Sequence, residues 1–63
     1  MPAEEIPQEL AELLARDTTA KARWDRLAPS HQHEFNQWVG DAKRAETRAR
    51  RAAQALEMIK GKQ

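Results

Sequence analysis

The scarcity of large apolar side chains limits most strongly what this chain can fold into. Its 63 residues include twelve alanines and only thirteen larger apolar residues, and there is no cysteine. A single core of this size is marginal, and neither a disulfide nor a thiolate metal site can reinforce it. We therefore expect one domain at most, residues 1–63, with a core too small to enclose a substrate.

The residue types that make up most of the chain favour helices. Ala, Glu, Arg, Lys, Leu and Gln dominate, β-branched residues are few, and no stretch alternates apolar and polar residues as a half-buried strand would. The sequence predicts an all-α fold, a small bundle of three to four helices. The helices are expected near residues 7–15, 18–27, 31–42 and 45–60, and their short connections favour near-antiparallel neighbours.

Capping residues, proline and glycine predict the helix boundaries. The second helix has three N-cap candidates, Asp17, Thr18 and Thr19. Pro29 ends that helix, and Ser30 is the clearest N-cap because it follows proline and precedes a helical pattern. Gly61 is expected just beyond the last helix.

Each predicted helix carries one apolar stripe. The stripes of the first two helices are Ile6, Leu10, Leu13, Leu14 and Ala20, Trp24, Leu27. The stripes of the last two are His31, Phe35, Trp38, Val39, Ala42 and Ala45, Ala49, Ala52, Leu56, Ile59. The alanines of the last helix should let another helix approach closely.

Charge is distributed unevenly along the chain although the formal net charge is only +1. Residues 1–17 have a balance of −4, residues 18–40 of +1, and residues 41–63 of +4. An acidic start and a basic end can hold a small bundle together, or the basic end can bind an anionic partner.

The basic residues are densest at the start of the fourth predicted helix, at Lys43, Arg44, Arg48, Arg50 and Arg51. Three of them form an arginine ridge, because Arg44, Arg48 and Arg51 fall within about 60° on a helical wheel. The ridge, with Lys43, is our candidate site for binding phosphate or carboxylate groups. The alternative is that it pairs with Glu9, Glu12 or Glu34 of the same molecule. Arg50 is expected to pair with Glu46 instead.

Catalytic groups are poorly represented. There is no Cys or Tyr, and Ser30 is better explained as a cap. His31 and His33 point in different directions on a helix, so they cannot hold one metal ion. We expect His31 to pack on the apolar stripe, with a role as a ligand as the alternative. No enzymatic activity, metal or cofactor is expected.

Nucleic-acid binding through the basic fourth helix is an alternative function. The outer face of the third helix offers residue types that can contact bases, Gln32, His33, Asn36 and Gln37. However, that helix has no Lys or Arg before Lys43 to contact phosphates, and the net charge is small for a DNA-binding domain.

One segment resembles the YdeI/OmpD-associated family, also labelled bacteriocin-protection proteins (OmdA type). The pattern is PSH-x-x-E-aromatic-x-x-W-aliphatic-x-x-AK-x-x-ETR-x-RR, from Pro29 to Arg51. The helical stretches before and after it, from about Ile6 to Met58, fit as well. The resemblance puts these residues at motif positions: His31, Glu34, Trp38, Lys43, Glu46, Thr47, Arg48, Arg50 and Arg51.

The resemblance implies a helical domain that commonly forms the C-terminal part of longer proteins; here it is expected to stand alone. It also implies a link to bacteriocin tolerance or an outer-membrane porin, without a molecular mechanism. The chain has Ala45 where the family has proline, so the third and fourth helices could be continuous. Glu46 or Thr47 is expected to help to start the fourth helix.

The expected function is therefore a non-enzymatic interaction module that uses the arginine ridge and the adjoining apolar edge. Its partner would be another protein or an anionic ligand, and the chain itself a monomer or weak homodimer. The sequence shows neither a secretory signal nor a membrane-spanning segment, so we expect a cytoplasmic location.

Overall fold

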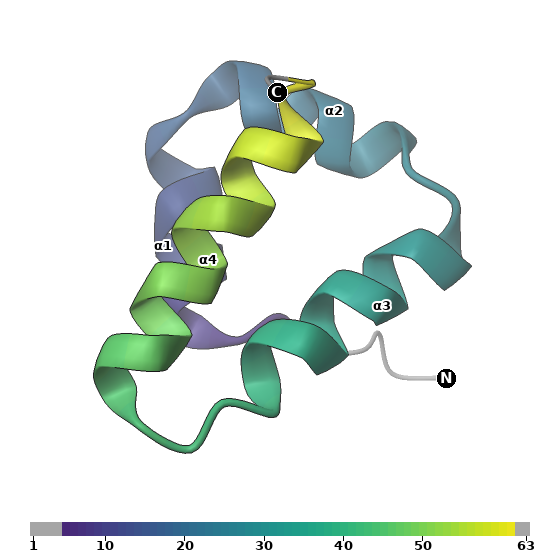
Figure 1. Ribbon diagram of the computed structural model, residues 1–63. Helices are drawn as coiled ribbons and strands as arrows, with labels where there is room; N and C mark the ends of the chain where they lie inside the picture. Colours follow the sequence, from purple (N-terminus) through teal and green to yellow (C-terminus); the bar gives the residue numbers. More distant parts are fainter. Residues whose placement is uncertain (1–4, 62–63) are drawn as a thin grey trace.

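The computed structural model describes residues 5–61. In this range the chain forms no strand and four helices, which are α1 (Gln8–Arg16), α2 (Thr18–Arg26), α3 (Pro29–Gly40) and α4 (Ala45–Ile59) (Figure 1). The all-α prediction is confirmed. Residues 41–44 separate α3 from α4, so the two helices are not continuous even though Ala45 replaces the family's proline. None of the helices in the described range combines the length and the apolar character needed to cross a membrane.

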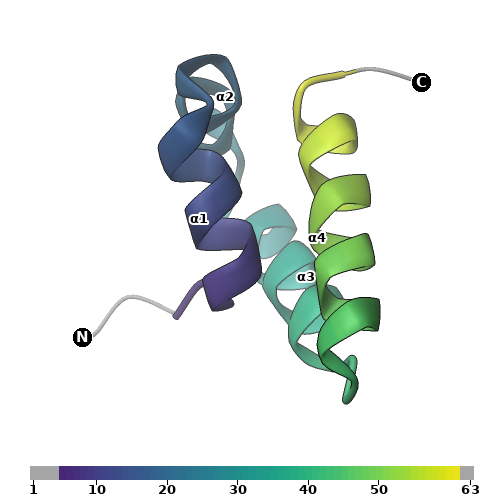
Figure 2. The same cartoon turned by 90° about the vertical axis from the view of Figure 1, so that its left-hand side faces the viewer.

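The helices α1 and α4 lie side by side and make the most extensive helix–helix contact of the structure (Figure 2). They run in the same direction, and two ion pairs join their corresponding ends. Near the starts of the two helices, Arg48 Nε lies 3.2 Å from Glu9 Oε2. Just after their ends, Lys60 Nζ lies 2.8 Å from Asp17 Oδ2.

The helix α2 crosses the top of this pair instead of running back along α1 (Figure 1). The prediction of near-antiparallel neighbours is therefore wrong for α1 and α2. Only Asp17, in an extended conformation (φ −126°, ψ 99°), joins the two helices. A single residue leaves too little chain for α2 to reverse direction and pack along α1.

Two of the predicted helix boundaries are confirmed. Asp17 caps α2, because its Oδ1 accepts a hydrogen bond from the backbone N–H of Ala20 at 3.0 Å. Gly61 follows α4 with φ +80°, and its N–H donates to the carbonyl of Met58 at 3.0 Å. A left-handed glycine at this position satisfies carbonyl groups that the end of the helix would leave free.

The predicted N-cap role of Ser30 is wrong. The N-cap of α3 is Ala28, Pro29 is the first helical residue, and Ser30 lies inside the helix on the surface. Proline suits the first helical position because its φ is preset and its missing N–H would have no helical partner. It also holds Ala28 extended (ψ 146°), so the helix begins one residue before the serine that we expected to cap it.

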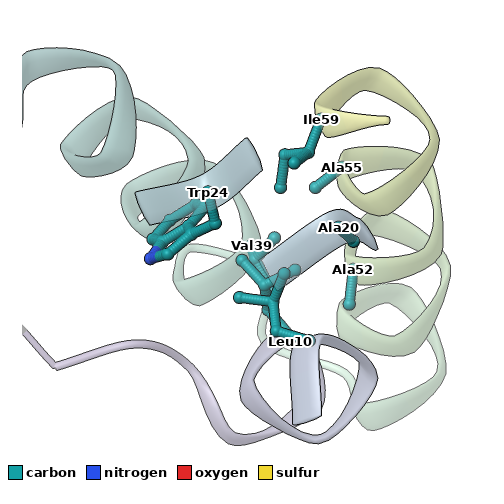
Figure 3. Packing of buried hydrophobic residues seen from close by; sticks show 8 residues of the cluster. Leu10, Ala20, Trp24, Val39, Ala52, Ala55 and Ile59 are labelled. Atoms are coloured by element: carbon teal, nitrogen blue, oxygen red, sulfur yellow. The ribbon is translucent and has the colours of Figure 1, made fainter. Parts of the chain in front are cut away.

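The core lies where all four helices meet (Figure 3). Its buried members are Leu10, Leu14, Ala20, Trp24, Val39, Ala52, Ala55 and Ile59. The stripes predicted for α1 and α2 are confirmed, because Leu10, Leu14, Ala20 and Trp24 are buried, and Ile6, Leu13 and Leu27 pack against them partly buried. In α4 the prediction is partly wrong, because Ala45 and Ala49 are exposed whereas Ala55 is buried.

The buried face of α3 also differs in part from the predicted apolar stripe. Asn36 and Val39 are its buried residues, whereas Phe35 and Trp38 are half-buried at the edge of the core. The ring centroids of Phe35 and Trp24 lie 6.2 Å apart, so Phe35 still packs against α2. His31 is exposed, and its predicted packing on the apolar stripe is wrong. The two aromatic rings of α3 thus lie at the margin of the core, whereas Trp24 of α2 lies inside it.

Candidate functional site

The arginine ridge is divided between structural contacts and the surface. Arg48 is half-buried and lies between α1 and the end of α3. Its Nε donates to both carboxylate oxygens of Glu9, at 3.3 and 3.2 Å, and its Nη1 donates to the carbonyl of Gly40 at 3.4 Å. The alternative that the ridge pairs with an acidic residue of the same molecule is thus confirmed for Arg48 and Glu9.

The ion pair also changes the titration of the carboxylate. The pKa of Glu9 lies below its ordinary value, first because of a hydrogen bond from its own backbone N–H and then because of the hydrogen bond from Arg48. Since Glu9 lies in the first turn of α1, free N–H groups of the helix start surround it.

Arg51 joins α4 to α3. Its Nη1 donates to the backbone carbonyl of Trp38 at 2.8 Å, and its guanidinium carbon lies 5.4 Å from the centroid of the Trp38 ring. A guanidinium at this distance over an indole face makes a favourable cation–π contact. Arg51 therefore stabilises the α3–α4 contact and at the same time covers one side of Trp38.

The other predicted basic residues remain on the surface. Arg44 is the N-cap residue of α4, Lys43 precedes it, and both side chains are exposed. Within residues 5–61 neither forms an ion pair or a side-chain hydrogen bond. The structure thus leaves Lys43 and Arg44 available to an anionic partner, whereas Arg48 and Arg51 are engaged.

The start of α4 differs from its prediction in two respects. Glu46 lies in the first turn, where its charge favours the positive end of the helix dipole, but no side chain caps the helix. Thr47 is half-buried in the next position. Arg50 is exposed and, among the described residues, makes no ion pair with Glu46, so the expected surface pair is absent there.

A shallow apolar hollow of about 200 Å³ lies beside Arg51 between α3 and α4. It is lined by Glu34, Phe35, Trp38 and Met58. Met58 is the large apolar residue that is exposed in the described range, with 52% of its surface accessible. Met58 lies outside the sites predicted from the sequence. The available signal was its position seven residues after Arg51, which places both side chains on the same face of α4.

The side chains proposed to contact bases do not form one outer face. Gln32 is half-buried and donates through Nε2 to the carbonyl of Trp24 at 2.8 Å. Asn36 is only 6% exposed. Two of the four residues are therefore directed into the fold, and nothing in the structure supports the nucleic-acid alternative.

In the described part of the chain, no group of three or more His, Asp or Glu side chains is placed so that it could hold a metal ion.

Comparison with known proteins identifies one family. Its model, described as "Bacteriocin-protection, YdeI or OmpD-Associated" (OmdA), matches residues 4–61. This range contains the whole motif and all four helices. No match was found among curated proteins or solved structures.

Proposed function

The chain belongs to the OmdA family of bacteriocin-protection, YdeI- or OmpD-associated domains, and from this premise we propose that it is a non-enzymatic module that binds another protein. The proposed surface is the α3–α4 edge, which we define as Lys43, Arg44, Phe35, Trp38 and Met58. It combines two exposed cations with an apolar hollow. Its partner would be a protein segment with acidic residues at one end and an apolar anchor at the other.

The exposure of Met58 beside two half-buried aromatic rings is the observation that carries this proposal. Single exposed apolar side chains are ordinary, but Met58, Phe35 and Trp38 line one hollow, and Arg51 covers the adjacent ring face. Aromatic residues, Met and Arg are the types enriched in the cores of protein interfaces.

The length of the edge limits the partner segment. Arg44 and Met58 are fourteen residues apart along α4, so at a rise of 1.5 Å per residue the edge is about 20 Å long. An amphipathic helix of about four turns would cover it. The small volume of the hollow admits one side chain of the partner rather than a whole ligand.

The test must separate surface residues from structural ones. Replacing Arg44, Arg48 and Arg51 together would remove the Glu9 ion pair and the Trp38 contact along with any binding. We therefore choose Met58→Gln and the double variant Lys43→Gln/Arg44→Gln, whose side chains are exposed. Arg50→Gln is the matched control, because Arg50 is also an exposed arginine of α4 but lies outside the edge.

Affinity capture from cell extract, followed by calorimetry with the purified partner, measures the effect. We expect Met58→Gln and the double variant each to weaken binding at least about tenfold, while Arg50→Gln and the thermal unfolding curves remain as in the wild type. A partner that binds all variants equally would remove the α3–α4 edge as the binding surface.

A further inference from the structure

A second concave region lies on the opposite end of the molecule from Lys43 and Arg44. It is an open cleft of about 630 Å³ between α2 and the end of α4. Thr18, Thr19, Arg23 and Arg26 line it from α2, while Leu27 and Ile59 supply apolar walls. Its volume lies within the range of about 300–1,000 Å³ that is usual for small-molecule sites.

The two arginines of this cleft, Arg23 and Arg26, are not engaged in contacts that compensate their charge within residues 5–61. They are three residues apart on α2, so both project from the same side of the helix. Both are exposed, and within residues 5–61 neither takes part in an ion pair or a side-chain hydrogen bond. The neighbouring carboxylate of Asp25 is held by Lys21, whose Nζ lies 2.7 Å from Asp25 Oδ1.

The other charged groups near the cleft include both an ion pair and a carboxylate, because the pKa of Lys60 is raised first by the hydrogen bond that it donates to Asp17 and further by the nearby, exposed Glu57. Lys60 and Asp17 form their own ion pair at 2.8 Å. Arg23 extends toward the end of α4, because its Nη1 lies 3.7 Å from the place that a Cβ of Gly61 would occupy. The guanidinium of Arg23 therefore closes one side of the cleft, and the two arginines are the charged side chains that line it.

We infer that this cleft binds a phosphate monoester that carries an apolar group. Two guanidinium groups can donate paired hydrogen bonds to phosphate oxygens, and two positive charges match a phosphate group that is close to a dianion at neutral pH. The hydroxyl of Thr18 or Thr19 can donate to a further oxygen, while Leu27 and Ile59 contact the apolar group. The proposed phosphate contacts come from side chains of α2 and not from the backbone N–H of Ala20, which already donates to Asp17.

Phenyl phosphate is a suitable probe, with inorganic phosphate and benzoate as comparison ligands. Binding is followed by NMR chemical shifts at constant ionic strength in a phosphate-free buffer. We expect saturable shifts that centre on α2 and Ile59, with phenyl phosphate bound more tightly than either comparison ligand. If inorganic phosphate binds as tightly as phenyl phosphate, the apolar group makes no contact with the cleft. If benzoate binds as tightly as phenyl phosphate, the cleft does not prefer a dianion.

Substitutions at the two arginines complete the test. Arg23→Gln and Arg26→Gln should each weaken phenyl phosphate binding about tenfold or more, because a charge-assisted hydrogen bond is lost. Arg50→Gln, which lies outside the cleft, should bind as the wild type does. If Arg23→Gln and Arg26→Gln lower the unfolding temperature but leave the affinity unchanged, the arginines are structural and the inference fails. The absence of saturable binding at millimolar phenyl phosphate would also refute it.

Discussion

Arg44, Arg48 and Arg51 are the same residue type on one side of one helix, yet each has a different environment. Arg48 meets Glu9 of α1, Arg51 meets Trp38 of α3, and Arg44 lies on the surface at the helix start. A helical wheel places the three together, but only the neighbouring helices decide which of them are engaged. Residue type and spacing therefore identified a candidate ridge without separating its exposed residue from the two that contact other helices.

The two glycines provide a residue-scale prediction. Gly40→Ala should stabilise the protein by about 0.4–1 kcal/mol, because alanine loses less conformational freedom on folding. Its φ is negative, and an added Cβ would lie at ordinary contact distance from Pro7 Cγ, 3.8 Å. Gly61→Ala should destabilise by about 1–2 kcal/mol, because φ +80° is a left-handed conformation.

Urea unfolding of both variants measures these changes. The prediction requires that the two substitutions, which add the same methyl group, act in opposite directions. If Gly40→Ala is destabilising as well, the contact with Pro7 is closer in solution than the structure places it.

At the scale of the element, helix starts and helix faces differ in how well they could be predicted. The start of α2 follows from Asp17, and the start of α3 follows from Pro29 once proline is given precedence over Ser30. The buried face of α4 followed only in part, because Ala52 and Ile59 are buried as predicted, whereas Ala45 and Ala49 are exposed. Alanines occur at positions 45, 49, 52, 53 and 55 around that helix, and burying alanine gains too little free energy for a wheel to choose among them.

The N-cap of α2 provides an element-scale prediction. Asp17→Asn keeps a side-chain oxygen that can accept from Ala20 N–H but loses the ion pair with Lys60, whereas Asp17→Ala loses both. We expect Asp17→Ala to lower the unfolding temperature more than Asp17→Asn does, and both to lower it relative to the wild type.

Thermal unfolding by circular dichroism at neutral pH makes this comparison, with Lys60→Gln as the control for the ion pair alone. Lys60→Gln should act like Asp17→Asn, and combining the two should add little further change. Equal losses in the Asn and Ala variants would mean that the cap does not stabilise α2.

At the scale of the whole molecule, the parallel arrangement of α1 and α4 is held by an ion pair at each end. The pKa of Asp17 is lowered, first by the hydrogen bond from Lys60 and then by that from the Ala20 N–H, just as the pKa of Glu9 is lowered at the other end. The acidic first segment and the basic last segment therefore do hold the bundle together, at these two points.

Acidification should weaken this arrangement. Because both carboxyl groups have a pKa below their ordinary values of 4.5 and 3.8, their stabilisation is complete above about pH 4.5 and is lost as the pH falls through the lowered values. The free energy of unfolding of the wild type should thus decrease between about pH 4.5 and pH 2.

The double variant Glu9→Gln/Asp17→Asn should lose less stability than the wild type over this interval. Glu34→Gln is the control, since Glu34 is exposed, lies beyond the first turn of its helix and forms no ion pair with any described residue. Urea unfolding at pH 7 and pH 3 gives the comparison. A double variant as sensitive to acid as the wild type would show that other groups control the acid response.

The sequence by itself determined the all-α fold, the approximate helix limits and the family motif, and it narrowed the N-cap of α2 to Asp17, Thr18 or Thr19. These properties depend on helix propensity, proline and capping, which act within a few residues. The tertiary structure decided that α1 and α4 are parallel, that α3 buries Asn36 and Val39 rather than His31, and that two of three ridge arginines are engaged. Because the chain has so few large apolar residues, burying one face of α3 or α4 gains little more free energy than burying another. The packing of the other helices therefore determines which face is buried.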